Sequence, residues 1–227
     1  MRFDKEKVSI IIPTKNEGEG LRKVITSLKS YANEIIVIDG HSTDNTQDII
    51  KKTNARYVLD HGKGRGDAVR LGIEISKGEV LVFVDGDGSH LVRDIPRLIG
   101  PIFENQADLV IGSRRTGGSF DLNMSFDGIL RSGGADFLAY LINRKFKTHL
   151  SDILYSFRAV RRNAALKLNL VSNDFRIEQE MVIKCLNQNL RLMEIPSQEK
   201  ARAWGVSKLH TLTGLKFVFS LIRELYF

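Results

Sequence analysis

The chain has 227 residues, of which 42% are hydrophobic, so it is long enough to bury the core of one globular unit. Its 34 Lys and Arg against 27 Asp and Glu leave a net charge of +7, which favours anionic partners such as nucleotides or phospholipid surfaces. The single cysteine excludes an internal disulfide, and the N-terminal stretch lacks the apolar core of a signal peptide. No run approaches the about 20 apolar residues of a membrane span, so we expect a soluble body.

Short apolar runs bounded by turn residues alternate with helical patterns along the first half of the chain. The runs predict buried strands at Val8 to Ile12, Glu34 to Ile38, Arg56 to Leu59, Val80 to Val84 and Leu109 to Ile111. The stretches between them predict helices at Glu19 to Tyr31, Thr43 to Thr53, Gly66 to Ser76 and Asp94 to Glu104. This alternation favours an α/β fold with a mainly parallel sheet and helices on both faces, in which ligands bind beyond the carboxyl ends of the strands.

The regular alternation fades in the second half of the chain. The stretch GSRRTGGSFDLNMSFDG predicts a mobile loop that could close over a substrate. Further elements are expected as helices at Ile129 to Lys145, Asn163 to Leu168 and Arg176 to Asn189, and as a short strand at Arg191 to Ile195. After a domain spanning 1–209, residues 210–227 predict an amphipathic helix with a narrow polar stripe, which either docks on the core or lies on a membrane surface.

Two acidic residues follow the fourth predicted strand. In VLVFVDGDGSH a fully apolar run leads into Asp85 and Asp87, which are separated only by Gly86. A turn through the glycines lets both carboxylates face one cation, and oxygen ligands of this kind suit hard ions such as Mg²⁺ or Mn²⁺. The pattern predicts a divalent metal site that binds a diphosphate.

A third acid, Asp39, ends the second predicted strand in EIIVIDGHSTDNT. Ser42 or Thr43 is in position to cap the helix that follows, which accounts for the hydroxyl cluster without any ligand. The cap does not account for Asp39, which could accept hydrogen bonds from a ribose or a base edge.

A glycine-rich turn, HGKGRGDA, enters the third predicted helix. Backbone amides, the helix N-terminus and the charges of Lys63 and Arg65 could meet phosphate there. The spacing is GxGxG and follows the third strand, whereas a dinucleotide-binding fold places GxGxxG after the first. A Walker phosphate loop is absent from the sequence.

A family resemblance is carried by a series of motifs in a fixed order. IIIPTKNE, IVIDGHSTDNT, GKGRGDAVRLG, FVDGDGSH, LVIGSR, DILYSFRAVRR and ARAWGVSKL resemble the family 2 glycosyltransferases, most closely the dolichyl-phosphate mannose synthase group. The resemblance extends over residues 8–209. It implies a GT-A fold, a nucleotide-sugar donor, a divalent metal, and a polyprenyl phosphate acceptor at the cytoplasmic face of a membrane.

The resemblance also assigns roles to residues of this chain. It implies that the donor is bound by Pro13, Glu17, Asp39, Lys63, Gly64, Asp67, Asp85, Gly86 and Asp87, and that Asp85 and Asp87 hold the metal. It implies that the acceptor phosphate meets Ser113, Arg114, Arg131, Arg202 and Lys208, with Asp87, Arg114 and Arg202 as the catalytic residues. The chain departs from the family pattern at Ser89, where a glutamine is common, and at Gly40 and His41, where an acid and a glycine are usual.

The expected reaction transfers mannose or glucose, with inversion, from GDP-mannose or UDP-glucose to a polyprenyl (dolichyl) phosphate. The expected place is the cytoplasm, peripheral at the inner face of a membrane. Two enzyme alternatives stay open: a glycosyltransferase with a soluble acceptor, and a dinucleotide-binding oxidoreductase. A nucleic-acid-binding module is not expected, because the basic residues are dispersed and carboxylates at strand ends repel phosphate.

Overall fold

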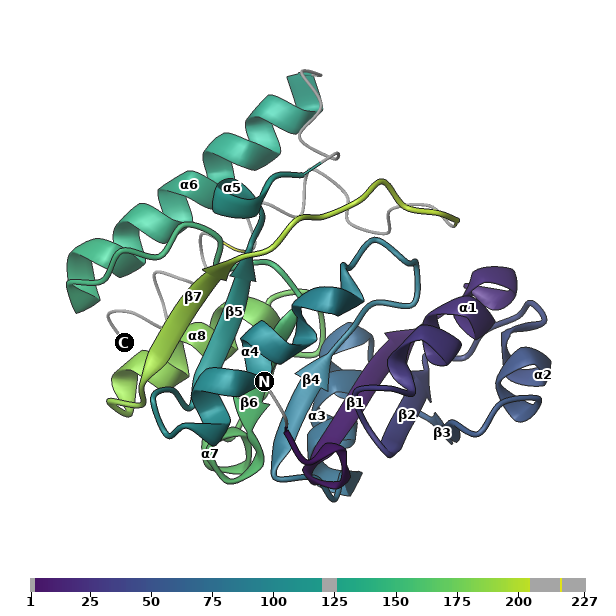
Figure 1. Cartoon of the computed structure of the whole chain (residues 1–227). Coiled ribbons are helices and arrows are strands. Elements are labelled where there is room, and N and C mark those ends of the chain that lie inside the picture. The colour runs from purple at the N-terminus through teal and green to yellow at the C-terminus, as the bar shows by residue number, and fades with distance from the viewer. Residues whose placement is uncertain (1–2, 120–125, 205–216, 218–227) are drawn as a thin grey trace.

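The computed structural model describes residues 3–119, 126–204 and 217, without the side chains of residues 19 and 126–132. A seven-stranded sheet crosses the molecule in the order β3-β2-β1-β4-β6-β5-β7, and Figure 1 shows the strands side by side. The strands are β1 (Val8–Thr14), β2 (Glu34–Asp39), β3 (Arg56–Leu59), β4 (Val80–Phe83), β5 (Leu109–Ser113), β6 (Arg158–Arg161) and β7 (Leu192–Pro196). All neighbours pair in parallel except β6, which is antiparallel to both β4 and β5.

Helices cover both faces of this sheet, as the alternating sequence predicts. They are α1 (Gly18–Leu28), α2 (Thr46–Lys51), α3 (Arg65–Ile75), α4 (Ile95–Phe103), α5 (Arg114–Gly117), α6 (Phe126–Phe146), α7 (Arg162–Lys167) and α8 (Ile177–Asn187), with short 3₁₀ turns at η1 (Lys5–Lys7) and η2 (Val92–Asp94). In Figure 1, α6 lies on the side of the molecule opposite α2.

Two apolar clusters form the core, one on each face of the sheet. Side chains along β1 alternate between them: Ile10 and Ile12 join the cluster formed with α1, α2 and α4, whereas Ile11 joins the cluster formed with α3, α6, α7 and α8. This alternation follows from the period of two in a strand. Burial on both faces explains why β1 and β4 appear in the sequence as continuous apolar runs.

Several predicted boundaries are wrong in detail. The 112–128 segment is not loop throughout, because β5 continues to Ser113, α5 follows it, and α6 begins at Phe126. The second helix is shorter than expected, because residues 42–45 form a turn that bonds to neighbouring loops before α2 begins. Strand β6 was not predicted at all.

The expected C-terminal helix at 210–227 lies outside the described residues, apart from Phe217. Phe217 is buried in the cluster that contains α8, and its carbonyl accepts a hydrogen bond from Gln179 Nε2 (3.4 Å). Among the helices that the structure describes, none is long and apolar enough to cross a membrane.

Candidate functional site

A cavity of about 460 Å³ opens at the carboxyl ends of β1 to β4, where the acidic residues of the sequence converge. Six of the residues that the family resemblance assigns to substrate binding line it: Pro13, Glu17, Gly64, Asp85, Asp87 and Arg202. Its other lining residues are Thr14, Lys15, Gly40, His41, Asp60, His61, Gly62, Arg65, Ala68 and Phe175. Parallel strands that end at one edge therefore bring together residues almost 190 positions apart in the chain.

Asp85 lies just beyond β4 and accepts hydrogen bonds from side chains of two other segments. Arg65 donates from Nη2 to Asp85 Oδ1 (2.8 Å) and from Nε to Glu178 Oε1 (2.7 Å). Ser156 Oγ donates to Asp85 Oδ2 (2.6 Å). Burial acts to raise the pKa of Asp85, but the positive charge of Arg65, the neighbouring His90 and the hydrogen bonds from Ser156 and Arg65 together outweigh it and hold that pKa well below its usual value.

His90 completes the buried surroundings of Asp85. The backbone amide of Asp85 donates to Nδ1 of His90 (3.2 Å), and burial lowers the pKa of His90, which favours a neutral ring with its proton on Nε2. Nε2 lies 3.3 Å from Ser156 Oγ, and the ring sits against Tyr155 and Phe157. Sequence reasoning missed these partners of Asp85 because most of them come from distant segments.

Asp87 is 2% exposed and has a different set of partners. Its Oδ1 accepts hydrogen bonds from the amide and the hydroxyl of Ser89, at 3.0 and 2.7 Å. Its Oδ2 forms an ion pair with Nη1 of Arg202 (3.0 Å). Both oxygens of this cavity-lining carboxylate therefore have partners, and one of the partners is a cation.

Residues 199–204, here called the strap, run across the loop that carries Asp87. Backbone amides of Lys200 and Ala203 donate to the carbonyls of Ser89 (2.9 Å) and Asp87 (3.1 Å). At the end of the strap, Trp204 Nε1 donates to the carbonyl of Gly86 (3.0 Å). The strap therefore positions Arg202 beside Asp87 through bonds that do not involve the arginine side chain.

Asp39, predicted to meet the base or ribose, does not line the cavity. Ser42 donates to its Oδ1 from the amide (3.0 Å) and the hydroxyl (2.5 Å), and Tyr57 donates to its Oδ2 (3.0 Å). Burial is the larger cause, and the hydrogen bond to Asp39 the smaller one, of a rise in the pKa of Tyr57 to about 12. Ser42 therefore does not cap α2; Asp44 accepts from the amide of Thr46 instead (3.0 Å).

The glycine-rich turn approaches protein backbone as well as the cavity. Gly64 has φ +110°, and a side chain there would meet the carbonyl of Asn173 at 2.7 Å; the amide of Gly66 donates to that same carbonyl. One amide expected to meet phosphate is thus already bonded. Asp67 accepts from the amide of His61 (2.9 Å), and neither it nor Lys63 lines the cavity.

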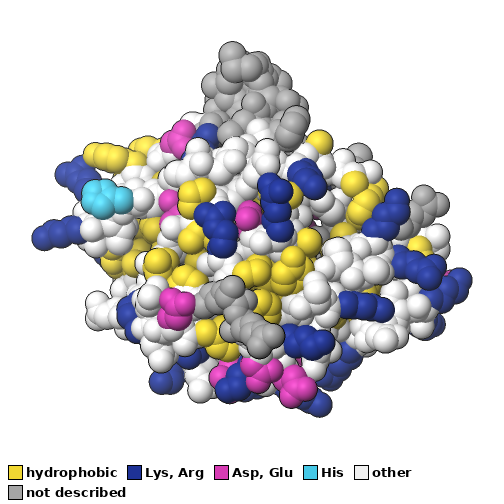
Figure 2. All heavy atoms as spheres, in the orientation of Figure 1, with side chains coloured by type: hydrophobic (Ala, Val, Ile, Leu, Met, Phe, Trp, Pro, Cys, Tyr) yellow, Lys and Arg dark blue, Asp and Glu magenta, His cyan; other side chains and the backbone are white. Residues whose placement is uncertain are grey.

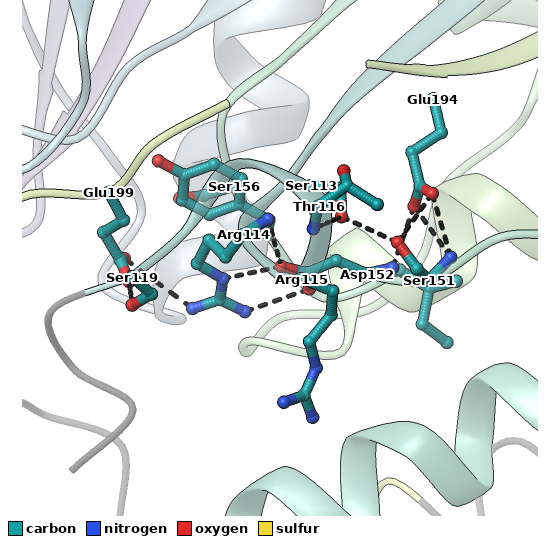
Figure 3. A network of polar contacts seen from close by, with 12 residues as sticks. Ser113, Arg114, Arg115, Thr116, Ser119, Ser151, Asp152, Ser156, Glu194 and Glu199 are labelled. Carbon is teal, nitrogen blue, oxygen red and sulfur yellow. Dashed lines mark hydrogen bonds and ion pairs between the residues drawn. The ribbon is translucent and has the colours of Figure 1, made fainter. Parts of the chain in front are cut away.

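Ser113 and Arg114 lie outside the cavity in a separate network, which Figure 3 shows at close range. Arg114 donates from Nε and Nη2 to both oxygens of Asp152 (2.7 and 3.0 Å), and its Nη1 lies 3.6 Å from Glu199 Oε1. Its guanidinium also stacks over the ring of Tyr155 at 4.7 Å. Arg114 thus joins the end of β5 to the strap. The side chain of Arg131 and all of Lys208 lie outside the described residues.

The donor set at the acidic loop fits a divalent metal. Asp85 and Asp87 supply carboxylate oxygens, and Mg²⁺ in proteins is bound by one or two carboxylates together with substrate phosphates and water. Within the residues that the structure describes, no cluster of three or more acidic, histidine or cysteine side chains forms a larger metal site. The arrangement can hold a cation, a diphosphate and a second anion within one cavity.

Comparison with known proteins gives consistent matches. The model of glycosyl transferase family 2 matches residues 9–168. Glycosyltransferase AglJ of Haloferax volcanii is 32% identical over 88% of this chain, and the dolichol-phosphate mannosyltransferase of Pyrococcus furiosus is 31% identical over 97% of it. The matches span 65% and 63% of those two relatives.

The match to the uncharacterized protein MJ1222 of Methanocaldococcus jannaschii covers nearly all of both proteins. It has 28% identity over 99% of this chain and 95% of the relative. Among solved structures, glucosyl-3-phosphoglycerate synthase from Mycobacterium tuberculosis, in complex with Mg²⁺ and UDP, superimposes with a TM-score of 0.77. That match has 19% identity and covers 97% of this chain and 79% of the other. At this identity the likeness establishes a GT-A-like fold.

Proposed function

The chain belongs to glycosyl transferase family 2, and on that premise we propose that it transfers a hexose, with inversion, from a nucleotide sugar to a polyprenyl phosphate. The observation that carries the proposal is the cavity in which Asp85, Asp87 and Arg202 meet at the carboxyl ends of the strands. The relative from Pyrococcus furiosus, named as a dolichol-phosphate mannosyltransferase, supports the lipid acceptor and a mannosyl donor.

In the proposed reaction, a phosphate oxygen of the acceptor attacks the anomeric carbon of the donor. The bond from that carbon to the diphosphate breaks, and the nucleoside diphosphate leaves with the electron pair. The acceptor is largely ionised at neutral pH, because its second pKa is about 6, so it needs little help from a general base. The chemical demand falls on binding and neutralising two anions.

Residues that line the cavity are placed to bind these two anions. Asp85 and Asp87 would hold the divalent metal, which supplies positive charge for the leaving diphosphate. Pro13 and Glu17 line the same cavity and would frame the nucleotide. Arg202, whose side chain also lines the cavity, would hold the attacking phosphate through its planar fork of donors.

A soluble phosphorylated acceptor is the second candidate. It is favoured by the structural neighbour from Mycobacterium tuberculosis, which has been solved with phosphoglyceric acid and UDP-glucose. Both candidates use the same donor cavity and differ in the phosphorylated acceptor.

Ligand-dependent thermal stability tests the donor class directly. We expect GDP or UDP to raise the melting temperature in the presence of Mn²⁺ and less without it, whereas NAD leaves it unchanged, because only ligands of the native state stabilise it. The stabilising nucleotide is then supplied as its labelled hexose conjugate, with polyprenyl phosphate or 3-phosphoglycerate as acceptor. Stabilisation by NAD alone would refute the transferase.

Replacement of one acid tests the metal role. We expect Asp87→Ala to retain less than about 10% of the transfer rate, a loss of more than about 1.4 kcal/mol of transition-state stabilisation, with the fold intact by circular dichroism. Asp48→Ala, an exposed acid on α2, is the matched control and should keep full activity. Substantial turnover by the Asp87 variant would remove that carboxylate from the mechanism.

A further inference from the structure

We propose that the imidazole ring of His41 stacks on the base of the donor nucleotide and forms the base subsite of the cavity. The inference rests on the proposed function for the nucleotide itself. It places the base beside a residue other than Asp39, whose carboxylate already accepts hydrogen bonds from Ser42 and Tyr57. It also gives a role to a position at which the family resemblance leads one to expect a glycine.

The backbone of His41 has a conformation that most side chains disfavour. Its φ is +61°, in the left-handed region where the Cβ atom crowds the following carbonyl oxygen. Six non-glycine residues in the described part of the chain have a positive φ, and four of them are asparagines, which adopt it more readily than most. Within this described set, His41 is the only residue that lines the cavity. Strain that persists at a ligand cavity points to a function for the side chain.

Contacts with the loop after β3 fix the His41 ring in the cavity wall. Its Nε2 lies 3.1 Å from the carbonyl oxygen of Asp60 and 3.5 Å from Asp60 Oδ1. Asp60 is itself held in place, because its side chain is 1% exposed and its Oδ1 accepts from the amide of Gly62 (2.7 Å). One edge of the imidazole is therefore anchored to a rigid turn.

The rest of the His41 ring is available to a ligand. Its side chain is 50% exposed although one edge is anchored, and it lines the same cavity as Asp85 and Asp87. An aromatic ring that is fixed at one edge and half exposed can stack on a base at little cost in side-chain entropy. Every base has a flat π-face, so stacking supports nucleotide binding whether the base is guanine or uracil.

The sheet places this ring at a distance from the metal site that suits a nucleotide. His41 follows β2, whereas Asp85 and Asp87 follow β4, and β1 lies between these two strands. Neighbouring strands lie about 4.8 Å apart, so the ends of β2 and β4 are about 10 Å apart. The ribose of a nucleoside diphosphate separates its base from its diphosphate by a comparable length. A diphosphate bound at Asp85 and Asp87 therefore leaves the base within reach of His41.

The experiment compares nucleotides with a probe that has no base. Binding of GDP, UDP and inorganic pyrophosphate, each with Mn²⁺, is measured by isothermal titration calorimetry on the full chain. We expect His41→Gly to weaken binding of the nucleotide that the wild type prefers at least about fivefold, the lower end of the contribution of one base stack. Pyrophosphate should bind His41→Gly within about twofold of the wild type, because it offers nothing for the ring to stack on.

Two further variants separate the ring from the backbone at this position. His41→Asn keeps a side chain that tolerates positive φ and can donate to Asp60, but it has no ring, so it should lose nucleotide affinity as His41→Gly does. His41→Phe keeps a ring and should bind the nucleotide within about threefold of the wild type. Wild-type affinity in His41→Asn, or a loss in His41→Phe as large as in His41→Asn, would overturn the stacking.

Stability provides a second readout, whose sign a purely structural role would reverse. His41→Gly removes the strain at φ +61°, so the melting temperature of the ligand-free protein should stay the same or rise. Lys147→Gly is the matched control, because Lys147 is exposed, has φ +55° and does not line the cavity. It should behave alike in melting temperature and leave nucleotide affinity unchanged. A fall of several degrees in His41→Gly with unchanged nucleotide affinity would mean that the ring supports the fold and not the ligand.

Asp87→Asn separates this inference from the proposed function. It should weaken both the nucleotide and pyrophosphate at least about tenfold, because it removes a ligand of the metal. If both probes bind the wild type and the His41 variants weaken neither, the base subsite is refuted and the transferase proposal stands. If neither GDP nor UDP binds the wild type in the presence of Mn²⁺, the transferase proposal fails and this inference fails with it.

Discussion

Asp108, at the start of β5, shows how single ion pairs tie the far side of the sheet together. Arg191, which precedes β7, donates to both of its oxygens (3.0 and 2.9 Å), and Arg161 at the end of β6 lies 3.4 Å away. One carboxylate thus joins three adjacent strands. Hydrogen bonds from Arg191 are the main reason that the pKa of Asp108 falls to about 2.

The sign of this shift predicts a pH dependence. A carboxyl whose pKa is lowered on folding adds stability above its unfolded pKa of about 3.9, and that stability is lost as the pH falls toward about 2. We expect Asp108→Asn to lower the free energy of unfolding by about 1 kcal/mol at pH 7, a value reduced for solvent screening. Urea unfolding at several pH values should show the deficit narrowing below about pH 4.

The control for this measurement is Glu104→Gln, an exposed acid just after α4. Its effect on the free energy of unfolding should be small and nearly independent of pH. A constant deficit in the Asp108 variant down to pH 3 would mean that its charge is not the source of the stability.

The site residues divide into those that the sequence revealed and those that it did not. Asp85 and Asp87 stood out because they follow an apolar run, and parallel strands bring such ends to one edge. Arg65 and Ser156 bond to Asp85, and Glu178 holds Arg65 from 113 positions away in the chain. No local pattern records such pairing, so the partners of each acid, and hence its freedom to bind metal, required the structure.

At the scale of elements, the strap packs against the protein because two glycines leave space for its Trp204 ring. Gly20 in α1 and Gly88 in the acidic loop lack the side chain that would occupy the space of the Trp204 ring. Gly88 also has φ +74°, a conformation that L side chains rarely adopt. The helix α1, the acidic loop and the strap therefore fit together only because two small residues face one large one.

Replacing Gly20 by alanine should break this fit. The added carbon would lie 1.6 Å from the Trp204 ring, so we expect the indole to leave its place and its emission maximum to shift to the red. Because the strap lies at the surface, the melting temperature should fall by only a few degrees. Gly133→Ala, on α6 with nothing within 4 Å, is the matched control and should leave the emission unchanged.

Strand β6 is the element that the sequence pattern does not predict. The parallel strands β1, β2 and β4 were visible because burial on both faces demands continuous apolar runs. In β6 the sequence is RAVR, with an arginine at each end. Arg158 is 1% exposed and donates to the carbonyls of Ile153, Tyr155 and Glu178. The residues next to Arg158 in the sequence do not predict that an arginine is buried there.

At the scale of the whole molecule, the net charge is +7, and on the face drawn in Figure 2 the basic side chains are spread out. Figure 2 shows Lys and Arg side chains over most of the visible face, interspersed with acidic and apolar ones. A dispersed charge of +7 attracts an anionic surface without a defined contact, and it is screened by salt. This suits an enzyme whose proposed acceptor is embedded in a lipid layer.

Vesicle binding tests this reading of the charge. We expect the chain to sediment with vesicles that contain anionic lipid at low salt, because each basic residue near such a surface contributes about 1 kcal/mol. Raising the salt toward 0.5 M should release it, and neutral phosphatidylcholine vesicles should retain little. Equal retention on neutral vesicles would point to apolar contacts instead of charge.

The place of β6 in the sheet has a further consequence for how the chain is made. Among the described strands, β5 pairs with β6 and β7, which both come later in the sequence, whereas β1 to β4 pair with one another before β6 joins β4. While a ribosome is still producing residues 120–157, β5 has no partner strand and β4 exposes one edge. The nascent chain therefore carries an open edge on β4 and an unpaired β5 until residue 161 has emerged, and a chain cut short before that point has a four-stranded sheet with β5 not joined to it.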